Sequence, residues 1–421
     1  MTRTMKNSGV EWIGEIPENW EVEKVKHFYQ NHKDTVGLEC DNYERLALTL
    51  NGVIKRNKLD TVGLQPENFA TYQILKQNEL VFKLIDLQNI STSRVGYSPY
   101  TGIVSPAYII LAPRSRTNTK YGEYYFKSLW QREIFNHIGD DGVRSSLNSS
   151  DLLNIPYLSF DHKEQSKIAA FLDEKCGAID EIINKTEQSI EEYKKLKQSV
   201  ITKAVTKGIR PNRPMQDSNI EWIAEIPEDW NVRKIFQLFN QVKNKNIGMT
   251  ENNLLSLSYG KIKKKNIETS FGLLPESFET YNIIEKDDIV LRLTDLQNDH
   301  RSLRVGLCKE RGIITSAYVT IRLKDKQYAP YLYYLLHTFD IKKGFYGMGD
   351  GVRQGLNWDE LKHLSLVLPP FDEQKEIADY LDEKCVEIDT LIEKKQQFLA
   401  EMANYKKSLI YEYVTGKKEV A

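Results

Sequence analysis

The sequence has few cysteines and histidines, and it lacks the patterns that would give them a function. Cys40, Cys176, Cys308 and Cys385 lie far apart in the 421 residues and form no CxxC pair. This argues against a disulfide framework and against a cysteine-built zinc site. The seven histidines contain no HExxH or HxH cluster. We therefore expect reduced, buried thiols and no metal site.

Long apolar runs and an excess of charge of one sign are also missing. No apolar run reaches 18 residues, and residues 1–10 (MTRTMKNSGV) lack the apolar segment that a secretory signal requires. We therefore expect a cytoplasmic protein with no membrane partner. Lys and Arg number 58 against 59 Asp and Glu, a formal charge of -1, which excludes a globally basic DNA-coating protein.

The chain consists of one unit of about 210 residues written twice. EWIGEIPENW at Glu11–Trp20 recurs as EWIAEIPEDW at Glu221–Trp230, with eight of ten positions identical. LDEKC at Leu172–Cys176 recurs at Leu381–Cys385. Solenoid repeats run at roughly 20 to 50 residues, so a period this long indicates that each copy is a domain in its own right.

Each copy begins with a mixed region of strands and helices. Short β-branched runs bounded by turn signals predict strands at 79–85, 103–111, 288–294 and 313–323. The aromatic stretches 121–135 and 328–339 have helical spacing and are typical of helices that pack on a core.

Each copy ends in a long helix. Residues 165–207 contain no proline, and apolar residues recur in steps of three and four, which predicts a heptad seam. A helix of this length would extend about 65 Å and needs a partner along its length. The seam residues are Leu172, Ile179, Ile183 and Ile190 in the first helix, and Leu381, Ile388, Ile392 and Leu399 in the second.

The predicted fold class is α+β, with two similar mixed α/β domains separated by two long helices. We expect the helices to pack antiparallel as a coiled coil, which holds the domains at opposite ends and gives a pseudo-two-fold internal repeat. A parallel pairing would require the short linker after Gly208 to return the chain about 65 Å. The expected boundaries are domain 1 at 1–160, helix 1 at 161–208, a linker at 209–218, domain 2 at 219–370 and helix 2 at 371–416.

This architecture suits an elongated two-fold target. Duplex DNA with separated half-sites is one candidate, since dimeric readers fix half-site spacing near one turn, roughly 34 to 36 Å. The alternative is a coiled-coil scaffold that spaces two protein-binding modules and has no DNA specificity. The architecture alone favours neither.

Basic residues at matching places in both copies are candidate phosphate contacts. Such runs are also common on solvated surface, and this alternative stays open. The candidates are Lys55, Arg56 and Lys58 in copy one, and Lys261, Lys263, Lys264 and Lys265 in copy two.

The repeated DLQN segments and the arginines after them carry the chemistry of base recognition. Gln and Asn can pair bidentately with adenine, and Arg with guanine. A turn stabilised by Asp86 and Asp295 is the alternative for the acidic residues. The glycine-rich GDDGVR and GDGVR loops add one cation each and lack the lysine of a P-loop. The candidates are Gln88, Asn89, Arg94 and Arg144 in copy one, and Gln297, Asn298, Arg301, Arg304 and Arg353 in copy two.

Signals for an enzyme are weak. NIPY at Asn154–Tyr157 is similar to the Asn-Pro-Pro-Tyr signature of amino-methyltransferases, but copy two has HLSL at the same place. No glycine-rich cofactor loop follows a strand in either copy. We expect no catalytic residue, and a self-sufficient DNA methyltransferase is kept only as an alternative that predicts S-adenosylmethionine binding by the isolated chain.

The doubled openings, FDHKEQSKIAAFLDEKC at Phe160–Cys176 and LPPFDEQKEIADYLDEKC at Leu368–Cys385 resemble the specificity subunit of type I restriction-modification enzymes over nearly the whole chain. The resemblance implies a noncatalytic subunit with two target recognition domains. Each domain would read one half of a bipartite asymmetric DNA site, and the paired helices would act as the spacer.

The resemblance also implies the partners and cofactors. Two modification subunits would dock on the chain, bind S-adenosylmethionine and methylate adenine at N6, and restriction subunits would add Mg- and ATP-dependent translocation and cleavage. No cofactor is expected in this chain. The likeness of the two domains predicts related half-sites in inverted orientation. We also expect substitution of Gln297 or Arg304 to relax recognition of one half-site without loss of assembly.

Overall fold

The structure is a computed structural model, and it describes residues 3–60, 68–87, 92–138, 146–265, 277–296, 298–299, 302–348 and 355–420. The chain forms two compact units. Unit 1 consists of Met1–Glu187 and Gln396–Ala421, and unit 2 of Gln188–Lys395. Each unit therefore contains one mixed domain and a part of each long helix.

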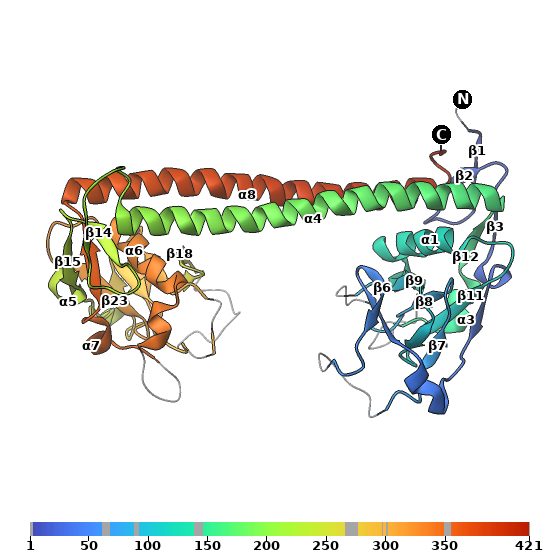
Figure 1. Ribbon diagram of the computed structural model, residues 1–421, viewed down its shortest axis with the longest axis horizontal. Helices are drawn as coiled ribbons and strands as arrows, with labels where there is room; N and C mark the ends of the chain where they lie inside the picture. Colours follow the sequence, from blue (N-terminus) through green and yellow to red (C-terminus); the bar gives the residue numbers. More distant parts are fainter. Residues whose placement is uncertain are drawn as a thin grey trace. The chain divides into compact units, whose positions relative to one another are not determined.

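Unit 1 contains the first mixed domain (Figure 1). Its helices are α1 (Thr119–Gln131), α2 (Ile134–Ile138), α3 (Ser149–Asn154), the first part of α4 (His162–Lys207) and the last part of α8 (Phe371–Val414), with short 3-10 turns at Val25–His27 and Gly37–Asn42. Its strands are β1 (Met5–Asn7), β2 (Glu15–Pro17), β3 (Glu21–Lys24), β4 (Tyr29–His32), β5 (Arg45–Thr49), β6 (Gly52–Arg56), β7 (Gln73–Leu75), β8 (Leu80–Phe82), β9 (Val95–Tyr97), β10 (Gly102–Val104), β11 (Ile109–Pro113) and β12 (Pro156–Ser159).

Two four-stranded sheets build the first domain, in the orders β6-β5-β10-β7 and β4-β11-β8-β9. Within them β10 pairs parallel with β5, and the other pairs are antiparallel. The core lies where α1 covers β8 and β9, below α4 (Figure 1). Tyr29, Phe126 and Tyr157 pack there edge to face and stacked, because aromatic rings on α1 meet those of β4 and β12.

Unit 2 repeats this order of elements. Its helices are the second part of α4, α5 (Ile235–Leu238), α6 (Ala329–Ile341), α7 (Trp358–Leu361) and the first part of α8 (Phe371–Val414), with 3-10 turns at Ile247–Met249 and Gly344–Gly347. Its strands are β13 (Met215–Asp217), β14 (Glu225–Pro227), β15 (Asn231–Lys234), β16 (Phe239–Gln241), β17 (Leu255–Ser258), β18 (Lys261–Lys264), β19 (Asn282–Ile284), β20 (Ile289–Leu291), β21 (Val305–Leu307), β22 (Gly312–Ile314), β23 (Val319–Leu323) and β24 (Ser365–Leu368).

The sheets of unit 2 follow those of unit 1 with one change. β16-β23-β20-β21 matches the second sheet of unit 1, whereas the first is divided into the pairs β17-β18 and β19-β22. An isolated parallel bridge between Leu254 and Ile313 joins these two pairs. The strand β13 lies inside the expected linker and pairs with β14, as β1 pairs with β2 in unit 1.

The expected strands at 103–111 and 313–323 are each divided by a turn. Tyr108 donates its backbone N–H to the carbonyl of Ser105 at 3.1 Å, and Tyr318 bonds Thr315 in the same way at 3.2 Å. The prediction of one continuous strand was wrong in both copies. The β-branched runs look continuous in sequence, but the turn between them lets β10 and β11 enter different sheets.

Within unit 1 the long helices run antiparallel. The rings of Phe171 on α4 and Tyr413 on α8 lie 4.4 Å apart, and the carboxylate of Asp180 lies 2.6 Å from Lys406. A later residue on α4 therefore contacts an earlier residue on α8, which means that the two helices run in opposite directions. Leu172 and Ile179 share their buried cluster with Leu409, Ile410 and Val414 of α8.

Unit 2 has the same arrangement. Lys395 lies over the ring of Tyr193 at 5.6 Å, and Lys197 pairs with Asp389 at 2.6 Å. The predicted antiparallel coiled coil and the α+β fold class are confirmed. Along the predicted seam Leu172, Ile179, Ile190, Leu381 and Ile388 are buried, and Ile183, Ile392 and Leu399 are half-buried.

The end of each long helix packs against the domain of the other sequence copy. The hydroxyl of Tyr121 in the first domain donates to the carbonyl of Val414 at 2.8 Å. In unit 2 the hydroxyl of Tyr331 donates to the carbonyl of Val205 at 3.1 Å. Each unit is therefore assembled from both copies, which explains why Val205-Thr206 and Val414-Thr415 recur in the sequence.

The described residues include no helix with the length and apolar content needed to cross a membrane. They also include no group of three His, Cys, Asp or Glu side chains placed to hold a metal ion. All four cysteines are free thiols. Cys176, Cys308 and Cys385 are buried, and burial raises the pKa of the Cys176 and Cys308 thiols to about 11. Cys40 is only half-buried, contrary to our expectation.

Candidate nucleic-acid interface

The β17-β18 hairpin of unit 2 presents a row of lysines. Lys264 lies opposite Leu255 and Lys261 opposite Ser258 in the antiparallel register. Successive residues of a strand point to opposite faces, so Lys261, Lys263 and Lys265 share one face. All three are exposed, and among the described residues none of them has an ion pair. Three unneutralised cations on one face make a site that favours an anion.

The basic residues of the equivalent hairpin in unit 1 contact neighbouring groups of the same unit. Arg56 pairs with Asp60 at 2.7 Å, and Lys58 donates to the carbonyl of Cys40 at 2.7 Å. Lys55 lies over the ring of Tyr100 at 5.4 Å. Gly52 and Ile54 occupy the positions that Lys261 and Lys263 have in copy two. Asp41, Asn42, Tyr43, Glu44, Arg45, Lys55, Arg56, Asn57 and Lys58 line a cavity of about 520 Å³.

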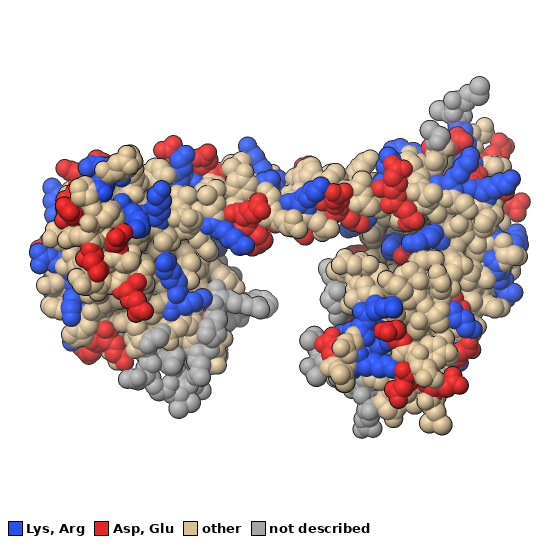
Figure 2. Space-filling view, viewed as in Figure 1, with Lys and Arg blue, Asp and Glu red and all other residues tan. Residues whose placement is uncertain are grey.

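Basic and acidic side chains are interspersed on the face of the chain shown in Figure 2. Along the long helices many of them pair with a neighbour, as Lys185 does with Glu181 at 2.5 Å and Lys194 with Glu191 at 2.6 Å. Lys261, Lys263 and Lys265 differ because none of them has an ion pair among the described residues, whereas Lys264 of the same strand pairs with Glu310 at 2.9 Å.

Arg304 is fully buried and binds the loop that precedes it. Its guanidinium donates to the backbone carbonyls of Arg292, Thr294, Asp295 and Asp299 at 3.0, 2.8, 3.2 and 2.6 Å. The hydroxyl of Tyr346 accepts from its Nε at 3.1 Å, and the carboxylate of Asp340 accepts from its backbone N–H at 2.6 Å. These bonds fix the described part of the DLQN loop of copy two.

Arg94 has the same position in copy one. It is 1% exposed, and its guanidinium donates to the carbonyl of Asp86. Burial lowers the pKa of Arg94, and the charge of Asp86 opposes this change. Asp86 and Asp295 both have a left-handed backbone, with φ of 53° and 58°. A short polar side chain is well suited to that conformation, which favours the turn interpretation of both aspartates.

The expectation that Arg94 and Arg304 contact bases does not fit this structure. All five guanidinium N–H donors of Arg304 are used within unit 2, and the side chain of Arg94 is buried, so neither guanidinium lies at the surface where a base edge could reach it. The structure instead makes each arginine the support of its DLQN loop. Asn298 lies at the surface of that loop and donates to the carboxylate of Asp295 at 2.8 Å. Gln88, Asn89, Arg144, Gln297, Arg301 and Arg353 lie outside the described residues.

Two titratable groups with opposite shifts lie on α6. Burial raises the pKa of Asp340 to about 6, although Arg304 opposes this change. Burial and the charge of Lys197 lower the pKa of His337 to about 4. Between these values the folded state holds a proton on Asp340 that the unfolded chain has released. Over the same range the unfolded chain holds a proton on His337 that the folded state excludes.

The stability of unit 2 should therefore vary little with pH between about 4 and 6, because the two contributions cancel. As pH rises through this range, the contribution of Asp340 to the free energy of unfolding falls and that of His337 increases. Each changes by up to about 1.4 kcal/mol per pH unit. We expect Asp340→Asn to make the free energy of unfolding rise with pH and His337→Gln to make it fall. Urea unfolding at several pH values measures both slopes. Equal slopes in the two variants would contradict the assignment.

Two polar contacts between domain and helix were not anticipated from the sequence. The hydroxyl of Tyr124 on α1 donates to Asp173 on α4 at 2.8 Å, and Tyr334 on α6 donates to Asp382 on α8 at 2.5 Å. Both aspartates belong to the repeated LDEKC motif. The repeated motif could have marked these two aspartates as important. Their tyrosine partners, however, lie about 50 residues earlier in each copy.

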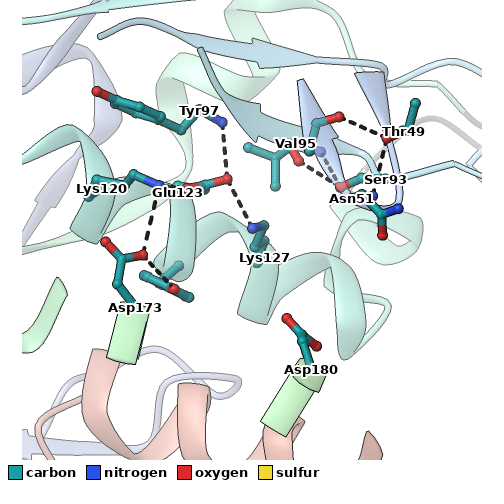
Figure 3. A network of polar contacts seen from close by, with 12 residues as sticks. Thr49, Asn51, Ser93, Val95, Tyr97, Lys120, Glu123, Lys127, Asp173 and Asp180 are labelled. Atoms are coloured by element: carbon teal, nitrogen blue, oxygen red, sulfur yellow. Dashed lines mark hydrogen bonds and ion pairs between the residues drawn. The ribbon is translucent and has the colours of Figure 1, made fainter. Parts of the chain in front are cut away.

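Glu123 was also missed. Its buried carboxylate accepts from the backbone N–H of Tyr97 at 3.1 Å and pairs with Lys127 at 2.9 Å, as Figure 3 shows. Burial acts to raise the pKa of Glu123, but Lys127, Lys120 and the Tyr97 N–H hold it below its ordinary value. Tyr333 occupies the position of Glu123 in copy two, so a comparison of the two copies does not single out Glu123. The network fixes α1 against β9 in unit 1 alone.

The duplicated domains and paired helices are those of a known class of structure. The chain superposes on a structure entitled "Structural basis underlying complex assembly and conformational transition of the type I R-M system" with a TM-score of 0.69, 11% identity and coverage of 96% of this chain and 99% of that one. It also superposes on the HsdS subunit from Thermoanaerobacter tengcongensis with a TM-score of 0.52, 12% identity and coverage of 96% and 98%. These similarities establish the fold.

Sequence comparisons find similar proteins along the whole chain. Residues 227–400 match the family model of the type I restriction modification DNA specificity domain. The chain is 25% identical over 426 residues to the putative type I restriction enzyme MjaX specificity subunit of Methanocaldococcus jannaschii, covering 97% of this chain and 96% of that protein. It is 25% identical over 434 residues to the MjaVIII specificity subunit of the same organism, covering 96% and 94%.

The resemblance to the specificity subunits of type I restriction-modification systems is thus confirmed. The relatives are named specificity subunits, and the prediction of a noncatalytic chain is confirmed on that ground.

Proposed function

We propose that this chain is the DNA-recognition subunit of a type I restriction-modification complex, and that each of its mixed domains, at 1–160 and 219–370, reads one half of a bipartite site. The observation that carries the proposal is the unpaired lysine row of β18 within a DNA specificity domain. Exposed lysines bind phosphates and set the register of a protein on the duplex. The DLQN loops next to the buried arginines would then read bases.

The two domains would contribute unequally to phosphate binding. Lys261, Lys263 and Lys265 have no ion pair among the described residues, whereas Arg56 is paired with Asp60. A near-neutral chain of this kind suits a complex in which partner subunits supply further basic surface. The paired helices would set the distance between the two half-sites.

The long helices also offer a surface for modification subunits. Leu391, Phe398 and Tyr405 of α8 are exposed at seven-residue intervals, so they lie on one face of the helix. Ile182 and Leu196 of α4 are exposed as well. Apolar side chains in such a row favour burial against a partner. We propose that two modification subunits dock here and on the domains.

The catalytic groups of the complex would come from these partners. The modification subunits would bind S-adenosylmethionine and methylate adenine at N6, and restriction subunits would add ATP- and Mg-dependent translocation and cleavage. The role of this chain would be to position them on DNA in the cytoplasm.

Selection from a randomised duplex library tests the proposal. The chain is assembled with its modification subunits, the retained duplexes are sequenced, and we expect enrichment of one bipartite motif. Retention without any sequence enrichment would instead identify a coiled-coil scaffold. Calorimetric binding of S-adenosylmethionine by the isolated chain would identify a self-sufficient methyltransferase. Either result would overturn the proposal.

A further inference from the structure

A groove of about 610 Å³ lies in unit 2 beside the last turns of α4, a volume within the range of ligand pockets of roughly 300 to 1,000 Å³. Val200 and Ala204 of α4, Tyr380 of α8, and Ile209 and Pro211 of the linker give it apolar walls. Lysines and arginines surround these walls, namely Lys203, Lys207, Arg210 and Arg213. The groove thus combines an apolar floor with a basic rim.

In unit 1 an aromatic ring of the chain itself takes the place of Ala204, and the cavity of about 360 Å³ beside it does not include Phe171 or Tyr413 in its lining. The repeat aligns Phe171 with Tyr380, and Tyr413 with Ala204. In unit 1 the rings of Phe171 and Tyr413 lie 4.4 Å apart with an angle of 35° between their planes. In unit 2 the position of this second ring is taken by Ala204, which is itself buried and lines the groove together with Tyr380. No ring among the described residues is paired with Tyr380.

The charge at the rim also differs between the units. Arg210 pairs with Glu376 at 2.6 Å, Arg213 pairs with Asp229 at 2.6 Å, and both are neutralised by these contacts. Lys203 is exposed and has no ion pair among the described residues. Its counterpart in unit 1 is Glu412, which pairs with Lys418 at 2.8 Å. The rim of the open groove therefore favours a carboxylate.

We propose that this groove receives an aromatic side chain, adjacent to a carboxylate, from a modification subunit bound at unit 2. The ring would pack against Tyr380 in the tilted manner of Tyr413 on Phe171, and the carboxylate would pair with Lys203. A stacked aromatic pair is worth about 0.5–1.5 kcal/mol beyond the area it buries. Because unit 1 fills this position itself, the two docking sites are unequal. The inference rests on the proposed function and identifies the part of unit 2 that the partner contacts.

Filling the groove tests the inference. Ala204→Tyr supplies from within the chain the ring that the partner would insert, and we expect binding of one of the two modification subunits to weaken at least tenfold. Native mass spectrometry across a concentration series should then show the complex with one modification subunit where the unaltered chain has two. Ala204→Ser keeps the groove open and serves as the control. Thermal unfolding confirms that both variants fold.

Lys203→Glu is the second variant, because an exposed side chain can be reversed in charge without disturbing the core. It should weaken the same binding step by a similar factor. Unchanged binding in both Lys203→Glu and Ala204→Tyr would overturn the inference and leave the proposed function intact. Failure of the unaltered chain to assemble would overturn the proposed function. Self-association that Ala204→Tyr abolishes would make a second copy the occupant and also overturn the inference.

Discussion

Replacing Arg304 with methionine is expected to destabilise unit 2 by about 3–5 kcal/mol, the cost of removing one partner from a buried charged network. The substitution leaves the carbonyls of Thr294 and Asp299 without their donor, and it leaves Asp340 in the core without the nearby positive charge. Thermal or urea unfolding of the full chain measures this loss. Arg304→Lys should recover part of it, because a lysine keeps the charge but cannot reach four carbonyls.

Arg311→Met is the matched control for this experiment. Arg311 is exposed and pairs with Glu251 at 3.0 Å and Glu285 at 2.5 Å, so its removal should cost about 1 kcal/mol for each exposed pair, well below the loss expected for Arg304. Normal stability in Arg304→Met, together with a changed DNA preference, would show that Arg304 contacts bases directly. That result would contradict the supporting role that the structure assigns to it.

Neutralising the lysine row of β18 should remove a large part of the salt dependence of DNA binding. Each phosphate contact contributes about 0.9 to the slope of log K against log salt, so a triple Gln variant of Lys261, Lys263 and Lys265 should lower the slope by about 2.7. Between about 50 and 200 mM salt this is a difference of about 40-fold. Binding of the assembled complex to duplex DNA at several salt concentrations measures the slope.

A charge-matched variant separates phosphate contact from net charge. Lys175, Lys185 and Lys194 of α4 pair with glutamates of the same helix, and their replacement by Gln changes the charge by the same amount. We expect it to leave the slope within about one unit of the unaltered chain, and the lysine-row variant to weaken binding equally on all sequences. Equal slopes in the two variants would rule out the lysine row as a phosphate site.

Much of the fold could be predicted because the same unit of about 210 residues occurs twice in the sequence. The repeat marks the domains, and the long proline-free heptads require a partner of equal length, which only the other copy provides. The packing of Val414 on Tyr121 could not be predicted in this way, since it joins residues 293 positions apart. Periodicity shows which face of a helix is buried but not which distant residue covers it.

The candidate site was predicted less well. The lysines of β18 are exposed as expected, because strand alternation and charge favour solvent. Arg94 and Arg304 were misjudged, since an arginine after a polar loop has the same sequence pattern whether it reads a base or binds the carbonyls of its own loop. Only the three-dimensional position of Asp340 and Tyr346 distinguishes these roles. The groove beside Ala204 became visible only through comparison with Tyr413.

The central claim is that two similar domains each read one half of a DNA site, and genome-wide mapping of N6-methyladenine tests it most directly. The map is recorded in a host that carries this chain with its modification subunits and in one that lacks the chain. We predict one motif that depends on the chain, with two specified halves, a spacer of fixed length, and related halves in inverted orientation. A continuous motif, or no motif that disappears with the chain, would contradict the account, and two unrelated halves would contradict the inference drawn from the likeness of the domains.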